Sequence, residues 1–294
     1  MTRWGAGLGG TRSDLGAATD VDLHEALRVC DRDPVASVLA ASRVEATLAE
    51  GGRRAGTALW GFRRDGRLDA VCWAGANLVP VCRGDDDEAL DAFARTALRQ
   101  GRRCSSIVGD AGAVLGLWRR LEPSWGPARE VRADQPSLVI DHEPLVDADP
   151  AVRLARPDEI GSVLPACVHM FLEEVGYSPV EGGGTAYESR VRALIAGQRS
   201  YVRMERGPDG PQVVFKAELG AVTREVAQVQ GVWVTPSRRG QGLSAPGMAA
   251  VVRLARARVA PLVSLYVNHY NERALASYER VGFHRVGTYA TVLF

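Results

Sequence analysis

A glycine-containing turn between an apolar strand and a helix is the segment of this 294-residue chain best suited to hold a ligand. It reads VWVTPSRRGQGLS at residues 232–244. Backbone N–H groups at a helix start lack partners within the helix and lie at its positive dipole end, so together they can bind a phosphate. Gly240 and Gly242 would let the backbone approach that ligand, and Arg238 and Arg239 add positive charge. The alternative is a strand–turn–helix corner without a ligand.

This turn resembles the pyrophosphate loop of the GNAT superfamily of N-acetyltransferases. That loop reads Arg/Gln-x-x-Gly-x-Gly/Ala, and Arg239, Gly242 and Ser244 stand at its defined positions, the serine being a departure from the commonest choice. Downstream, NERALASYERVGF at residues 271–283 is similar to the second signature of the family. The two motifs occur in the family's order and at about its spacing, and the resemblance covers residues 152–294.

The resemblance implies a site for acetyl-CoA in an opening between the strand that ends at Val234 and the strand that ends at Val267. A bulge separates these strands in the family, and we expect it at Gly231. For Asn271, an ordinary helix N-cap is the alternative role. The cofactor-binding residues implied are Val232, Trp233, Val234, Arg239, Gly240, Gln241, Gly242, Leu243, Ser244, Ala245, Asn271 and Ala274.

Transfer to an amine needs a base for the amine and an acid for the departing thiolate. The resemblance implies that Tyr278 is the acid, and a core tyrosine is the alternative. Many family members carry a glutamate a few residues before the position of Val232, but this chain has QVQ at residues 228–230. Glu218, on the neighbouring strand, is therefore our candidate base, acting through water.

Two further carboxylates, Glu173 and Glu174, follow Phe171 where the family's substrate-contacting loop lies. We expect these three residues to contact the acceptor, and either glutamate could also serve as the base through water. For all three glutamates the alternative is a solvated or ion-paired surface carboxylate.

Hydrophobic periodicity places these motifs on strands and helices. It predicts an α/β (α+β) fold, with a mixed, mostly antiparallel sheet flanked by helices and a GNAT fold in the C-terminal half. In that half we expect strands at residues 152–156, 200–205, 212–221, 226–235, 262–267 and 283–294, and helices from residue 157 and at 187–196, 245–259 and 271–281. In the first half we expect strands at residues 58–62, 68–73, 77–82, 104–108 and 130–140, and helices at 41–49, 86–100 and 111–121.

The chain is long enough for two domains, and the polar segment DHEPLVDADP at residues 141–150 is the expected linker. We place an N-terminal α/β domain at residues 1–145 and the GNAT domain at 150–294. The first half repeats the order of elements but has VPVCRGDDDE at residues 79–88, where acids would repel a pyrophosphate. We interpret it as a degenerate, tandem GNAT-like domain without cofactor, with an unrelated α/β domain as the alternative. The layout resembles actinobacterial two-domain GNAT proteins.

Composition narrows the classes of function. The net charge of +1 argues against nucleic acid as a partner, and no apolar run is long enough for a membrane span. Five scattered cysteines without a CxxC pair, and dispersed histidines, predict no metal site and a cytoplasmic protein. Lys216 is the single lysine among 36 basic residues, which we interpret as codon bias.

The sequence therefore predicts an acetyl-CoA-dependent N-acetyltransferase that acts by direct attack in a ternary complex. We expect a primary amine on a small molecule, peptide or protein as acceptor, and a monomer or homodimer. The alternatives are a non-catalytic CoA-binding regulator, because the strand glutamate is missing, and an aminoacyl-tRNA-dependent acyltransferase.

Overall fold

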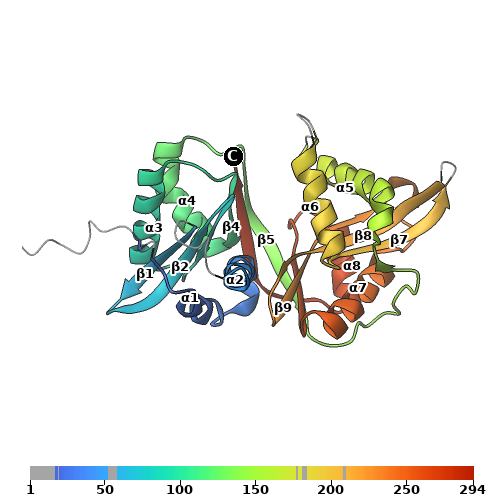
Figure 1. Ribbon diagram of the computed structural model, residues 1–294, viewed down its shortest axis with the longest axis horizontal. Coiled ribbons are helices and arrows are strands. Elements are labelled where there is room, and N and C mark those ends of the chain that lie inside the picture. The colour runs from blue at the N-terminus through green and yellow to red at the C-terminus, as the bar shows by residue number, and fades with distance from the viewer. Residues whose placement is uncertain (1–16, 19, 52–57, 177, 181–183, 208–209) are drawn as a thin grey trace, which may run out of the picture. The chain divides into compact units, whose positions relative to one another are not determined.

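The computed structural model describes residues 17–18, 20–51, 58–176, 178–180, 184–207 and 210–294 (Figure 1). The chain divides into two compact units that exchange short segments. Unit 1 takes residues 1–32, 43–133 and 290–294, and unit 2 takes residues 33–42 and 134–289. Each unit combines a sheet with helices, so the predicted α/β class is confirmed. The predicted linker, residues 141–150, contains no helix or strand.

Unit 1 has two antiparallel strand pairs, β1–β2 and β2–β3, followed by the parallel pair β3–β4. Asp65 and Gly66 join β1 to β2, both at positive φ (50° and 80°), as a tight hairpin turn requires. Its core packs α3 and α4 against the sheet through Phe93, Leu117 and Trp118. Its elements are α1 (Leu23–Cys30), β1 (Leu59–Arg64), β2 (Arg67–Ala74), β3 (Asn77–Val81), α3 (Asp87–Gln100), β4 (Ser106–Asp110) and α4 (Ala111–Trp125).

Three elements are divided between the units, namely α2 (Pro34–Ala49), β5 (Glu130–Ile140) and β11 (His284–Leu293). In unit 2 the strand order is β11-β5-β10-β9-β8-β7-β6, and β9 and β10 pair in parallel. The remaining elements are β6 (Arg153–Leu154), η3 (Pro157–Glu159), α5 (Ile160–Val175), α6 (Thr185–Ala196), β7 (Ser200–Gly207), β8 (Gly210–Val222), β9 (Val226–Val234), η4 (Pro236–Arg238), α7 (Ser244–Arg258), β10 (Leu262–Tyr266) and α8 (Glu272–Val281).

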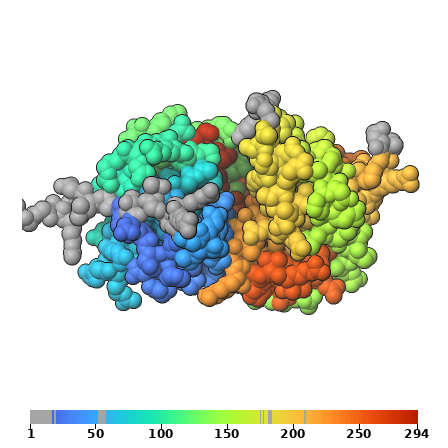
Figure 2. Space-filling view, in the orientation of Figure 1, coloured from blue at the N-terminus to red at the C-terminus, as the bar shows by residue number. Residues whose placement is uncertain are grey.

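Helices cover both faces of the sheet in unit 2 (Figure 1). On one face α7 and α8 pack on Phe215, Ala217 and Leu219 of β8. On the other, α5 and α6 pack on Val213 and Trp233 and form the yellow-green and yellow surface of Figure 2. Between Val213 and Leu219, both faces of β8 are therefore buried.

The predicted strands and helices are confirmed with small shifts at their ends, and two helical segments exceed the prediction. α1 was not predicted, although Leu23, Ala26 and Cys30 are buried at helical spacing; Asp22 caps it by accepting a hydrogen bond from the Glu25 N–H at 2.8 Å. α2 begins at Pro34 rather than residue 41, in agreement with the tolerance of proline in a first helical turn.

Candidate functional site

The parallel strands β9 and β10 separate part-way along their length. Their pairing runs from Val226 opposite Leu262 to Gln228 opposite Ser264 and then ends. β9 continues to Val234, so among the described residues the edge at 229–234 that faces β10 has no paired strand. Free backbone N–H and C=O groups at such an edge can pair with an extended ligand. The expected opening is present.

A β-bulge lies in β9 at the start of this free edge. Gln230 pairs with Glu218 and Trp233 pairs with Lys216, so two residues of β9 face one residue of β8. Gly231 is one of the two and has φ +59°, a conformation that glycine adopts without strain. The predicted bulge at Gly231 is confirmed.

The loop beyond β9 presents an open helix N-terminus. Gly240 and Gly242 have φ of +77° and +75°, and a Cβ atom on either would meet nothing within 4 Å. The N-cap residue of α7, Leu243, makes no side-chain capping bond, and the first turn of α7 contains no acid. The N–H groups of this turn are thus available to an anion.

The two arginines of the loop bind neighbouring parts of unit 2. Arg239 donates to the Val234 carbonyl oxygen at 3.0 Å and forms an ion pair with Glu173 of α5 at 2.6 Å. Arg238 forms an ion pair with Glu205 of β7. Glu173 and Glu205 offset much of the charge of the two guanidinium groups. The backbone N–H groups at the start of α7 are therefore the groups most available to bind an anion in this loop.

The two sequence motifs meet where α8 contacts α7. Ser277 donates a hydrogen bond from its hydroxyl to the Ser244 Oγ at 2.9 Å. At the start of α8 the Asn271 side chain accepts a bond from the Ala274 N–H at 3.2 Å, so Asn271 is an N-cap as the alternative proposed.

Tyr278 lies two turns along α8, is 6% exposed and packs edge-on against Phe283 with ring centroids 5.9 Å apart. Burial, with a smaller contribution from Glu174, raises the pKa of its hydroxyl above the ordinary value. The phenol carries its proton at neutral pH, as an ordinary tyrosine does, and the raised pKa makes it a weaker proton donor.

Glu218 is not a surface carboxylate, which corrects one of the alternatives considered above. It is 2% exposed and forms an ion pair at 2.8 Å with Lys216, whose side chain is fully buried. The Cys167 thiol donates to its Oε1 at 3.2 Å, while Oε2 is buried without a hydrogen-bond partner. Burial alone would raise the pKa of Glu218, but the Lys216 ammonium outweighs it and holds that pKa below its ordinary value.

Sequence reasoning missed the partners of Glu218. Lys216 and Glu218 alternate with apolar residues on β8, a pattern that normally marks a solvated strand face, but α5 and α6 cover that face here. The solitary lysine in an arginine-rich chain was the one available sign that residue 216 differs from the other basic residues.

The candidate acceptor residues lie on α5. Phe171 packs edge-on against Tyr187 of α6 at 5.6 Å, and the exposed Glu173 is engaged by Arg239. Glu174 is near enough to influence the pKa of Tyr278. Trp233 points into the core beneath α5, so only its backbone is free to meet a ligand. Tyr177, within the expected substrate loop, lies outside the described residues.

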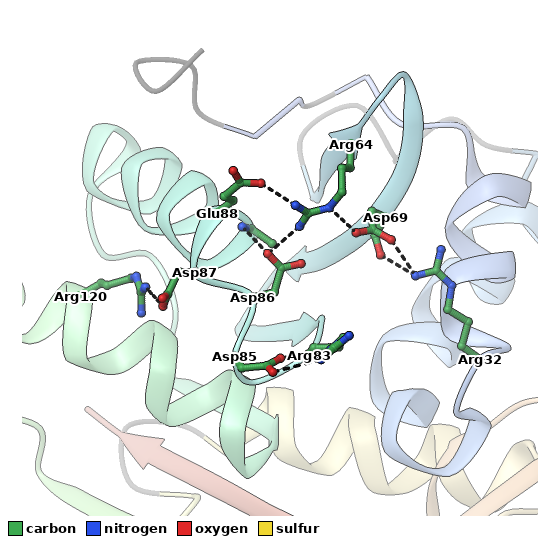
Figure 3. Close-up of polar contacts among 10 residues, drawn as sticks. Arg32, Arg64, Asp69, Arg83, Asp85, Asp86, Asp87, Glu88 and Arg120 are labelled. Atoms are coloured by element: carbon green, nitrogen blue, oxygen red, sulfur yellow. Dashed lines mark hydrogen bonds and ion pairs between the residues drawn. The ribbon is translucent and has the colours of Figure 1, made fainter. Parts of the chain in front are cut away.

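The corresponding turn in unit 1 is capped and ion-paired by the protein's own groups (Figure 3). Asp86 caps α3 by accepting from the Ala89 N–H at 3.2 Å, and Arg64 forms ion pairs with Asp86 and Glu88. A Cβ atom on Gly84 would lie 2.7 Å from the Cα of Gly112, so the loop backbone is in contact with α4. Where unit 2 has an open, uncapped turn, unit 1 has a capped and acidic one.

Within the described ranges, no group of three or more histidine, cysteine or carboxylate side chains could hold a metal ion. No helix in those ranges is both long and apolar enough to cross a bilayer. All five cysteines are free thiols.

Comparison with known proteins adds two family matches. Residues 200–283 match the family described as "Acetyltransferase (GNAT) family", and residues 57–163 match "Domain of unknown function (DUF4081)". No curated protein matches the chain.

Several solved structures resemble the chain at low identity. A GCN5-related N-acetyltransferase from Sphaerobacter thermophilus is 16% identical, with 94% of this chain and 93% of that chain covered and a TM-score of 0.56. A tandem GNAT protein from the clavulanic acid biosynthesis pathway is 14% identical, with coverages of 95% and 97% and a TM-score of 0.52. A GNAT-family acetyltransferase from Colwellia psychrerythraea is 12% identical, with coverages of 83% and 89% and a TM-score of 0.50. At these identities the resemblance shows the fold.

Proposed function

Because residues 200–283 belong to the acetyltransferase (GNAT) family, we propose that unit 2 transfers an acetyl group from acetyl-CoA to a primary amine. The main support for this proposal is the position of the free strand edge relative to the helix N-terminus. The free edge of β9 leads directly into the uncapped N-terminus of α7, so a strand-like arm and a phosphate group could be bound side by side.

The residues around the opening fit acetyl-CoA. The backbone of Val232, Trp233 and Val234 would pair with the pantetheine arm, and Ala274 would leave room beside it. The turn at residues 239–245 would bind the pyrophosphate through its N–H groups, helped by the open space at both glycines. Asn271 would meet the donor while still capping α8. When bound, acetyl-CoA supplies an activated acyl group as a thioester.

Two side chains would move the protons. Through its unpartnered Oε2, Glu218 would attract the acceptor ammonium and take its proton through water, and its lowered pKa makes it a weak base for this step. Tyr278, protonated at neutral pH, would donate its hydroxyl proton to the departing thiolate. Phe171 and Glu174 would contact the acceptor from α5.

We propose that unit 1 binds no acetyl-CoA. Its acids occupy the helix terminus that would meet the pyrophosphate, and Asp86 already accepts a hydrogen bond from an N–H group there. The chain would then carry one active site, in its second half. The free thiols support a cytoplasmic location.

The test is release of free CoA thiol from acetyl-CoA by the purified chain with a panel of primary amines. We expect turnover with at least one amine, and Tyr278→Phe should lower kcat by about 100-fold, the usual scale for loss of a general acid. Tyr201→Phe is the matched control, because Tyr201 is buried in the same core cluster but lies on β7. An unchanged kcat in Tyr278→Phe would contradict the assigned role.

The same experiment separates the alternatives. Tight CoA binding without turnover for any amine would favour a non-catalytic regulator. The observation in favour of this second function is the buried ion pair of Glu218 with Lys216, because it engages the candidate base. Salt-sensitive binding of tRNA would favour the aminoacyl-tRNA-dependent reaction.

A further inference from the structure

We infer that Lys216 is a positioning residue, whose ammonium fixes the β9 bulge at Gly231 and thereby the free edge of β9. The inference rests on the proposed function, because that edge is the one assigned to acetyl-CoA. Lys216 itself would touch neither the donor nor the acceptor; it would act through Gly231 and Glu218.

The first support is the identity and burial of the residue. The chain has 36 lysines and arginines, and residue 216 alone is lysine. It is also fully buried, at 0% exposure. An ammonium is a compact point charge whose three donors rotate freely, whereas a guanidinium is a larger planar fork. Arginine is the basic residue at all the other positions, but the buried position 216 holds lysine, the smaller cation.

The second support is what the ammonium contacts. Its Nζ donates to the Gly231 carbonyl oxygen at 3.1 Å and to the Glu218 carboxylate at 2.8 Å. A bulge disrupts the local ladder, and a buried carbonyl there needs another donor. A buried ammonium in turn needs a carboxylate. The Lys216 ammonium thus contacts β9 at the bulge, where β9 is no longer paired with β10.

The third support is the tightness of packing around the bulge. A Cβ atom on Gly231 would lie 3.2 Å from the Lys216 Nζ and 3.4 Å from the Glu218 Oε2. From α5, Cys167 donates to Oε1 of the same carboxylate at 3.2 Å. Movement of the bulge would therefore disturb the ion pair, and loss of the ammonium would release the Gly231 carbonyl.

Two variants separate Lys216 from Glu218. Glu218→Gln removes the carboxylate partner, but the Lys216 nitrogen, as ammonium or as neutral amine, can still donate to the Gly231 carbonyl oxygen. We therefore expect a Kd for CoA within about 2-fold of wild type and a large fall in kcat. The double variant Lys216→Met/Glu218→Gln removes both charges together and leaves no buried ion unpaired. We expect its Kd for CoA by calorimetry to rise about 10-fold or more, the scale for loss of one charged hydrogen bond. Arg153→Met, which breaks the Arg153–Glu159 ion pair away from the bulge, should bind CoA as wild type does.

The solitary lysine also allows a test without any substitution. Protein labelled with 13C at the lysine ε-carbon alone gives one labelled lysine NMR resonance, from Lys216. We expect this resonance to shift on titration with CoA and to report the calorimetric Kd. A resonance unchanged at saturating CoA, or a double variant that binds CoA as tightly as wild type, would overturn the inference while leaving the proposed function intact. A wild type that binds no CoA would overturn both.

Discussion

Substitution of Gly231 by alanine perturbs the β9 bulge by a single methyl group. Its φ of +59° lies in the left-handed region, which costs an L-residue about 1–2 kcal/mol. The new Cβ would also approach Lys216 Nζ and Met170 Cε to 3.2 Å each, closer than ordinary van der Waals contact. Overpacking of this kind costs about 1–3 kcal/mol, and the smaller entropy of the unfolded alanine chain offsets about 0.4–1 kcal/mol.

The expected net loss is about 2 kcal/mol in the free energy of unfolding, and at about 2–4 °C per kcal/mol it lowers Tm by about 4–8 °C. Gly242→Ala is the matched control, since Gly242 has φ +75° but nothing within 4 Å of its Cβ position. Alanine at residue 242 has the same backbone strain but none of the close contacts, so its loss of stability should be smaller by about 1–3 kcal/mol, the scale of the overpacking cost.

Urea unfolding of wild type and both variants measures these differences, and calorimetry with CoA on wild type and Gly231→Ala measures the effect on the free edge. Gly231→Ala should weaken CoA binding as well as stability. A Gly231→Ala protein no less stable than Gly242→Ala would refute the claim that Lys216, Glu218 and Met170 pack tightly on the bulge.

Three further predictions concern charges. Asp86→Ala removes the N-cap of α3 and should cost about 1 kcal/mol in urea unfolding without changing the Kd for CoA; weaker CoA binding would count against an inactive unit 1. Lys216 holds the pKa of Glu218 in the folded protein below its value in the unfolded chain. The ion pair therefore stabilises the fold at pH values above the pKa of Glu218 in the unfolded chain. This stabilisation is lost as the pH falls through the pKa of Glu218 in the folded protein. The stability advantage of wild type over Glu218→Gln should therefore shrink between pH 7 and pH 3, and an advantage that grew on acidification would contradict the ion pair. Glu173→Gln frees Arg239 from an exposed pair, which should tighten CoA binding about 2-fold at low salt and less at high salt; no change at low salt would show that Arg239 does not face the pyrophosphate.

Periodicity predicted most of the fold because each strand and helix keeps an apolar face of its own. The loop at residues 240–242 and the bulge at Gly231 were predictable because glycine at a turn or in mid-strand indicates positive φ. The short helix α1 was not predicted, although its buried residues lie at helical spacing.

The environment of Glu218 could not be predicted from local pattern. The alternation of polar and apolar residues on β8 indicates which side chains share a face. Whether water or a helix covers that face depends on α5 and α6, which are distant in sequence. The exchange of residues 33–42 and 290–294 between the units is likewise a tertiary outcome that no local pattern encodes. The domain bounds 1–145 and 150–294 and the site residues stay predictions.

The number of acetyl-CoA molecules bound per chain tests the central claim most directly. Calorimetric titration of the whole chain should give one site, located in unit 2, because α7 has an open N-terminus whereas α3 is capped by Asp86. Replacement of Gly242 by a bulky residue such as valine should abolish that site, because φ of +75° disfavours a β-branched side chain. A stoichiometry of zero or two, or one site that survives Gly242→Val unchanged, would contradict the account.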